Sequence, residues 1–165
     1  MRTDKIYLVG FMGAGKSSVA GALGGKLGWR VEDIDDLIER REGMTVADIF
    51  SRRGEAYFRR VERSVLAAQV PVRHAVVATG GGTYADPAHR SLIDRDGVSI
   101  WLDVSLTQVI ERLPSDGRRP LAADRAGMTR LFRDRLAAYR RAHVRLDADA
   151  PVGDIVERII DRLEL

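Results

Sequence analysis

Residues 5–23 read KIYLVGFMGAGKSSVAGAL and place a glycine-rich loop between an apolar run and a stretch with helical spacing. The loop matches the pattern G-x-x-x-x-G-K-[ST] through Gly10, Gly15, Lys16 and Ser17. Its glycines let backbone N–H groups turn toward phosphate oxygens, and the following helix adds the positive end of its dipole. A plain turn with a solvated lysine would have the same composition, but a strand before the loop and a helix after it favour phosphate binding. The stretch therefore predicts a nucleotide site beside the first strand.

Composition and charge narrow the class of protein. The chain has 165 residues, of which 45% are apolar, and this fits a single domain over residues 1–165. It has no cysteine, so it can form neither disulfides nor thiolate metal sites. No apolar run approaches the roughly 20 residues that span a bilayer, and we expect a cytoplasmic protein. The formal charge of +3 could attract phosphate esters, small acids or nucleic acid.

Apolar runs alternate with helical patterns along the chain, which predicts an α/β fold in three layers, because parallel strands need crossover connections. Five parallel strands are expected, at 5–9, 30–33, 75–78, 98–102 and 144–146. The expected helices are 16–27, 36–42, 46–53, 55–70, 87–95, 106–113 and 129–141, with one more at the end of the chain. Ligands of such sheets bind beyond the carboxyl ends of the strands.

Two carboxylates follow the second expected strand. If the strand continues to Asp35, the side chains of Asp33 and Asp35 share a face, because side chains alternate along a strand. One carboxylate could then support Mg²⁺, while the other accepts the proton of a substrate hydroxyl. Helix capping by Asp35 or Asp36, with Glu39 completing a capping box, fits the same spacing.

Three glycines, Gly80, Gly81 and Gly82, follow the third expected strand. They would let a ligand approach backbone N–H groups closely. A hinge or a tight turn would use the same residues. Their position at a strand end favours ligand binding.

The motifs, taken in order, resemble the shikimate kinase family. GFMGAGKS is followed by DID, then ADIF and GEAYFRRVE, then GGG, RRPL and YRR, over the range from Gly10 to Arg141. The resemblance implies a P-loop kinase fold with a helical substrate-binding region at 33–63 and a mobile lid at 112–127. It also implies transfer of the γ-phosphate of ATP to the 3-hydroxyl of shikimate, giving shikimate 3-phosphate and ADP on the route to chorismate and the aromatic amino acids.

On the nucleotide side, the resemblance implies a set of residues that contact ATP and Mg²⁺. Ser17 and Asp33 match the metal-binding serine and aspartate, and Lys16, Asp35 and Arg119 match the catalytic residues. The full nucleotide-binding set is Gly13, Ala14, Gly15, Lys16, Ser17, Ser18, Arg112 and Arg119. Ser18 stands where threonine is common, and the LDADAP segment at 146–151 looks shorter than usual, which leaves purine contacts from 147–151 open.

On the substrate side, Asp35 matches the proposed base, and Arg59 and Arg140 match arginines that bind the substrate carboxylate. Glu62 would orient Arg59, and Phe50 and Phe58 resemble an apolar wall beneath the ring. The implied substrate-binding set is Asp35, Arg59, Gly80, Gly81, Gly82 and Arg140.

Two other functions remain open at this point. One is a kinase for another small polyol acid, such as gluconate, and the other is a non-enzymatic, nucleotide-dependent protein that binds nucleic acid. We favour phosphorylation of shikimate over both, with shikimate, ATP and Mg²⁺ as ligands, no nucleic acid or membrane partner, and a monomeric chain.

Overall fold

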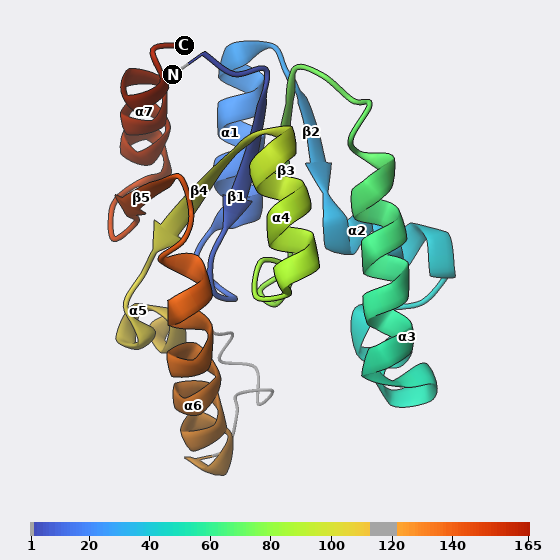
Figure 1. The fold of residues 1–165 in the computed structure, drawn as a ribbon. Helices are drawn as coiled ribbons and strands as arrows, with labels where there is room; N and C mark the ends of the chain where they lie inside the picture. Colours follow the sequence, from blue (N-terminus) through green and yellow to red (C-terminus); the bar gives the residue numbers. More distant parts are fainter. Residues whose placement is uncertain (1, 113–121) are drawn as a thin grey trace.

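The protein is built on an open parallel sheet with helices on both faces (Figure 1). The computed structural model describes residues 2–112 and 122–165. Five parallel strands pair in the order β2-β3-β1-β4-β5. Their bounds are β1 Lys5–Val9, β2 Arg30–Asp33, β3 Ala75–Ala78, β4 Val98–Asp103 and β5 Val144–Asp147. The predicted α/β fold with a five-stranded parallel sheet is confirmed.

The helices connect consecutive strands and cover the sheet. Their bounds are α1 Lys16–Leu27, α2 Ile34–Glu42, α3 Val46–Ala68, α4 Pro87–Asp96, α5 Leu106–Glu111, α6 Ala122–Tyr139 and α7 Val152–Leu163. Helix α1 packs against α7 and the β2–β3 part of the sheet, whereas α4 packs against β4 and α3. The α2–α3 pair extends away from the sheet at the right of Figure 1, and α6 extends at the lower left.

Burial follows the position of each strand in the sheet. All residues of β1 and β3 are buried, because both strands have neighbours on each side and helices above and below. The edge strands β2 and β5 are partly exposed. Accordingly β3 is wholly apolar and β1 is apolar apart from Lys5, while the edge strands carry several charged residues.

The second strand ends earlier than one interpretation of the sequence required. It stops at Asp33, whose side chain accepts a hydrogen bond from the Asp36 amide at 3.1 Å and so caps α2. Helix α2 therefore begins at Ile34 rather than at residue 36. Asp35 lies in the first helical turn, and neither Asp35 nor Asp36 is the cap that the alternative interpretation expected.

The other helix boundaries agree to within two residues, except that α6 begins seven residues earlier than expected and includes residues 122–127, which were expected to belong to the lid. The break expected between 46–53 and 55–70 is present, because Gly54 interrupts α3 with φ 81° and ψ 169°. Helix α6 starts at Ala122, before the expected residue 129, and ends at Tyr139. Residue 113, the predicted end of the preceding helix, lies outside the described residues.

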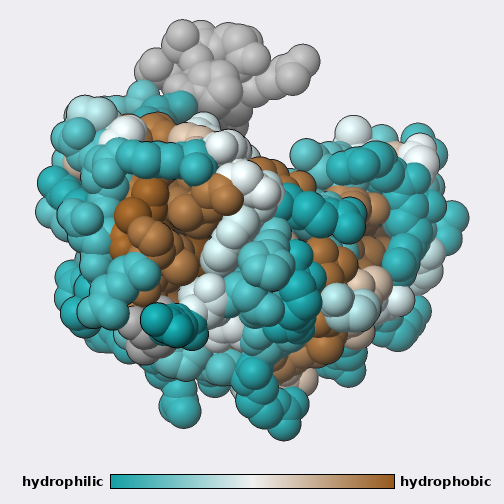
Figure 2. Space-filling view, turned by 90° about the horizontal axis from the view of Figure 1, so that it is seen from above, coloured by the Kyte–Doolittle hydropathy of each residue, from teal (hydrophilic) through white to brown (hydrophobic). Residues whose placement is uncertain are grey.

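Side chains on the surface are mostly hydrophilic, with apolar patches between them (Figure 2). In this view the molecule is hollowed between its main body and the lobe at the right, where Figure 1 places α2 and α3. Within residues 2–112 and 122–165, no helix combines the length and the apolar character needed to cross a membrane.

Candidate active site

The loop between β1 and α1 has a backbone that only glycine adopts readily. Gly13 and Gly15 have φ of 73° and 90°, in the left-handed region. Gly15 is also the N-cap of α1, so no side chain covers the first amides of that helix. The loop therefore directs a helix N-terminus toward the space above the sheet, the arrangement that binds phosphate.

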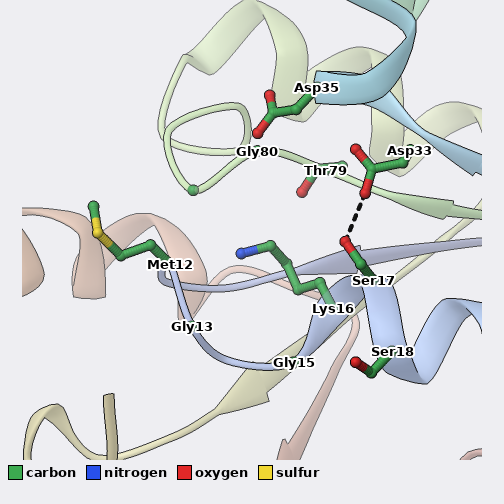
Figure 3. A pocket seen from close by; sticks show the side chains of 11 residues that line it. Met12, Gly13, Gly15, Lys16, Ser17, Ser18, Asp33, Asp35, Thr79 and Gly80 are labelled. Carbon is green, nitrogen blue, oxygen red and sulfur yellow. Dashed lines mark hydrogen bonds between the residues drawn. The ribbon is translucent and has the colours of Figure 1, made fainter. Parts of the chain in front are cut away.

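Lys16 is directed into this space from the start of α1 (Figure 3). Its ammonium donates to the carbonyl oxygens of Gly10 and Phe11 at 2.6 and 2.8 Å. Burial lowers the pKa of Lys16 to about 8, although the nearby Asp35 carboxylate acts in the opposite direction. A negatively charged ligand at this position would restore full protonation.

Ser17 and Asp33 supply hard oxygen atoms on the other side of the same space. The Ser17 hydroxyl donates to Asp33 Oδ2 at 2.6 Å, the contact drawn as a dashed line in Figure 3. Asp33 Oδ1 is already held by the Asp36 amide. A hydroxyl and a carboxylate fixed side by side fit Mg²⁺, which takes few protein oxygens and completes its shell with phosphate and water.

Asp35 approaches the glycine run after β3. A Cβ at Gly80 would lie only 2.9 Å from Asp35 Oδ1, so this carboxylate needs glycine at position 80. Burial raises the pKa of Asp35 to about 6, and the charge on Asp33 adds to the shift. The carboxylate is thus ionised at neutral pH and still able to accept a proton.

Three cavities meet around the loop. The central one is the phosphate cavity, which holds Lys16, Ser17, Asp33 and Asp35. The nucleoside cavity shares Gly13, Gly15 and Ser18 with it and is closed by Ala14, Arg112 and the segment around Pro151. The acceptor cavity, of about 250 Å³, shares Met12, Asp35, Gly80 and Gly81 with the central one.

Two guanidinium groups converge in the acceptor cavity. A Cβ at Gly82 would lie 2.5 Å from Arg59 Nη2 and 3.1 Å from Arg135 Nη2. Arg59 Nη1 donates to the buried carboxylate of Glu62 at 2.8 Å. Phe50 and Phe58 form the apolar wall of the cavity, with ring centroids 4.6 Å apart. Arginines brought this close together form a site for a small anion.

Arg140 does not reach this cavity, and its placement there was wrong. It follows the last residue of α6, and its side chain is exposed. The arginine that lines the cavity together with Arg59 is Arg135, four residues before the buried Tyr139. Tyr139 donates from its hydroxyl to the Gly81 carbonyl, so the helix face that carries Tyr139 and Arg135 turns toward the glycine run.

The structure brings most of the remaining expected site residues together. The lining of the three cavities includes Gly13, Ala14, Gly15, Lys16, Ser17, Ser18, Asp33, Asp35, Arg59, Gly80, Gly81, Gly82 and Arg112. Arg112 also donates to the Gly13 carbonyl at 3.2 Å. Arg119 and most of the expected lid at 112–127 lie outside the described residues.

Sequence reasoning missed Met12, Thr79 and Arg135. Met12 lines the phosphate and acceptor cavities, and Thr79 lines the phosphate cavity from the end of β3. Both residues could have been found from their neighbours in the sequence, because Met12 lies within the glycine-rich loop and Thr79 directly precedes the three glycines. For Arg135 the signal was its helical spacing from Tyr139, since residues four apart share a helix face.

Fold and site together define the class of protein: an ATP-dependent P-loop kinase that phosphorylates a small molecule. The chain belongs to the shikimate kinase family, whose family model, described as shikimate kinase, matches residues 12–164. A shikimate kinase of Sulfurihydrogenibium sp. is 44% identical over 161 residues, covering 96% of this chain and 97% of the relative. A shikimate kinase of Persephonella marina is 41% identical over 160 residues, covering 96% and 98%.

Solved structures agree with this assignment. Shikimate kinase from Acinetobacter baumannii in complex with shikimate superposes with a TM-score of 0.92 at 30% identity, covering 98% of this chain and 93% of that one. The Aquifex aeolicus enzyme gives 0.88 at 31% identity, covering 97% and 96%. A gluconokinase from Sinorhizobium meliloti gives 0.63 at 17% identity, with coverage of 99% and 94%, and this likeness shows the fold alone.

Proposed function

We propose that this chain transfers the γ-phosphate of ATP to the 3-hydroxyl of shikimate, releasing shikimate 3-phosphate and ADP. The observation that carries the proposal is the shared wall of the phosphate and acceptor cavities. Asp35 lines both cavities, and the paired guanidinium groups of Arg59 and Arg135 lie in the acceptor cavity. A substrate with a carboxylate at one end and hydroxyls at the other would extend from the arginines to Asp35.

In this proposal, Arg59 and Arg135 hold the substrate carboxylate through charge-assisted hydrogen bonds. Phe50 and Phe58 contact the ring carbons, which fixes the orientation of the hydroxyls. Asp35 accepts the proton of the attacking substrate hydroxyl. At the same time the hydroxyl oxygen bonds to the γ-phosphorus of ATP, and the bond between the γ-phosphorus and the β–γ bridging oxygen breaks, which leaves ADP. Because the pKa of Asp35 is raised to about 6, the carboxylate can receive this proton near neutral pH.

On the nucleotide side, Lys16 would move from the loop carbonyls to the β- and γ-phosphates. Ser17 and Asp33 would hold Mg²⁺, which neutralises charge on the phosphate oxygens when it is bound. The nucleoside would lie in the cavity closed by Arg112 and Pro151. For Arg119 and the lid at 112–127, the roles implied by the family resemblance remain predictions.

We also propose that the enzyme acts as a cytoplasmic monomer, with the helical region at 33–63 as its substrate-binding part and no nucleic-acid or membrane partner. The three adjoining cavities provide for both substrates within one chain, which supports the monomer.

A coupled ADP-release assay with purified chain, ATP and Mg²⁺ tests the function. We expect turnover with shikimate and none above background with gluconate. Turnover with gluconate alone would reject the assignment. Binding of DNA or RNA with a steep salt dependence, together with no stimulation by either acid, would favour the non-enzymatic alternative.

A further inference from the structure

A buried histidine lies behind the acceptor cavity, and the mechanism above makes no use of it. His89 is in the first turn of α4 and is 1% exposed. Asp86, the N-cap of that helix, accepts hydrogen bonds from the amides of Ala88 and His89 at 2.8 and 3.4 Å and fixes the backbone there. The backbone that carries the imidazole is therefore fixed by the cap of its own helix.

The imidazole faces the carboxylate that holds Arg59. Nδ1 of His89 lies 3.4 Å from Glu62 Oε1 and 3.2 Å from the Thr83 carbonyl oxygen. Both neighbours accept hydrogen bonds and neither donates at these atoms, so the proton belongs on Nδ1. His89 is thus a donor to the Thr83 carbonyl, and the same N–H group lies close to Glu62 Oε1 without a hydrogen bond to it.

Glu62 collects donors on both of its oxygens. Oε1 accepts from Arg59 Nη1 at 2.8 Å and faces His89, while Oε2 accepts from the Thr83 hydroxyl at 2.8 Å. The three side chains of Glu62, Thr83 and His89 are each at most 1% exposed, so water does not compete for these contacts. A carboxylate buried in this way keeps one orientation only while its donors are present.

Packing alone does not account for a histidine at position 89. Its second nitrogen, Nε2, is buried and has no hydrogen-bond partner among the described residues. An apolar side chain of similar size would fill the same space without bringing a second polar nitrogen into the interior. The imidazole contributes its Nδ1–H group, which contacts the Thr83 carbonyl and Glu62 Oε1.

We propose that His89 is a positioning residue for substrate-carboxylate binding, acting through Glu62 on Arg59. By helping to fix Glu62, it holds Arg59 with Nη1 turned inward and leaves Nη2 beside Gly82 for the substrate. Loss of the imidazole frees the Thr83 backbone, whose hydroxyl donates to Glu62, and removes the close contact at Glu62 Oε1. The Glu62–Arg59 pair can then rotate, which weakens binding of the acid substrate and leaves the nucleotide side unchanged. The inference rests on the proposed function, because the ligand of Arg59 is taken to be the carboxylate of shikimate.

Three substitutions separate this role from simple packing. His89→Asn can place an amide N–H near the position of Nδ1, His89→Gln places one near Nε2, and His89→Leu supplies none. We expect His89→Leu and His89→Gln to raise both KM and the calorimetric Kd for shikimate roughly three- to tenfold. His89→Asn should stay within about twofold of the unaltered chain, and KM for ATP should not change in any variant.

The inference is overturned if His89→Leu binds shikimate normally, or if Asn and Gln at position 89 behave alike. It is also overturned if KM for ATP rises in step with KM for shikimate, which a general loss of structure would produce. Should His89→Leu fail to fold, the comparison of Asn with Gln still decides. Calorimetry without ATP distinguishes a failure of the His89 proposal from a failure of the proposed function. A chain that binds shikimate but does not phosphorylate it contradicts only the proposed reaction.

Discussion

A buried lysine lies at the amino end of strand β1 and another lies in the loop and helix start beyond its carboxyl end, and the two lysines have different surroundings. At the amino end, Lys5 donates to Asp96 Oδ2 and the Gln69 carbonyl at 2.6 Å and to the Val70 carbonyl at 3.1 Å. Beyond the carboxyl end, Lys16 donates to two carbonyls of its own loop. Burial lowers the pKa of both lysines.

The carboxylates at the two ends differ in the same way. Burial alone would raise the pKa of Asp96, but hydrogen bonds from Lys5, Tyr7 and Arg73 lower it. Burial and neighbouring carboxylates instead raise the pKa of Asp35 to about 6. Charges at the amino end are paired within the protein and stabilise the fold, whereas we expect those at the carboxyl end to be paired by the ligands proposed above.

The largest effect is expected from Asp35→Asn, which removes the proton acceptor at the ligand-binding end. Because the two side chains have nearly the same shape, folding and ATP binding should be retained while kcat falls by about 10² to 10⁴. In the unaltered chain, kcat/KM for shikimate should fall about tenfold per pH unit below the pKa of Asp35, which is about 6.

Steady-state assays with shikimate across pH 5 to 8 measure both effects. The exposed neighbour Asp36 offers a matched control, since Asp36→Asn should change kcat by less than about twofold. A near-normal rate in Asp35→Asn would remove this residue from the chemistry.

Asp96→Asn should act on stability alone. It leaves the Lys5 ammonium buried without its carboxylate, so the free energy of unfolding should fall by about 3 kcal/mol. Urea titrations would measure the loss, and kcat should remain unchanged in native buffer. The double variant with Lys5→Met should recover part of the loss, because no unpaired lysine is then left behind. A decrease in kcat without any loss of stability would contradict the division between the two ends.

Arg135→Ala and Arg140→Ala test the smaller question of which arginine binds the substrate. A charge-assisted hydrogen bond contributes about 1.5 to 3 kcal/mol, so Arg135→Ala should raise KM for shikimate by roughly tenfold or more. Arg140→Ala should change it by less than about twofold, since that side chain is exposed. The reverse order in measured KM values would restore the placement inferred from the sequence.

Local patterns were sufficient for much of the fold and for the nucleotide side. The spacing from Gly10 to Ser17 was enough to predict the loop and to propose its ligand, because the residues expected to bind phosphate are consecutive in the chain. The pairing of Asp33 with Asp35 in one cavity was also correct. The expected extension of the strand to Asp35 was wrong, because the strand ends at Asp33, which caps α2, and Asp35 lies in the helix.

The substrate side depends on contacts between distant elements and could not be read in the same way. The YRR motif indicated Arg140, and no motif in the sequence indicated Arg135. Five residues correspond to a turn of about 140° around a helix, so only one of the two can face the glycine run. The contact of His89 with Glu62 joins α4 to α3, and no spacing within either helix predicts it.

The pairing of β1 with β3 has one more consequence. Lys5 stands opposite Ala75 and Leu8 opposite Ala78, and both the amide and the hydroxyl of Thr79 bond to the Leu8 carbonyl. The glycines that follow each strand therefore begin at the same height above the sheet. A residue inserted into either strand would shift one glycine loop relative to the other and turn the side chains beyond it to the opposite face of the sheet.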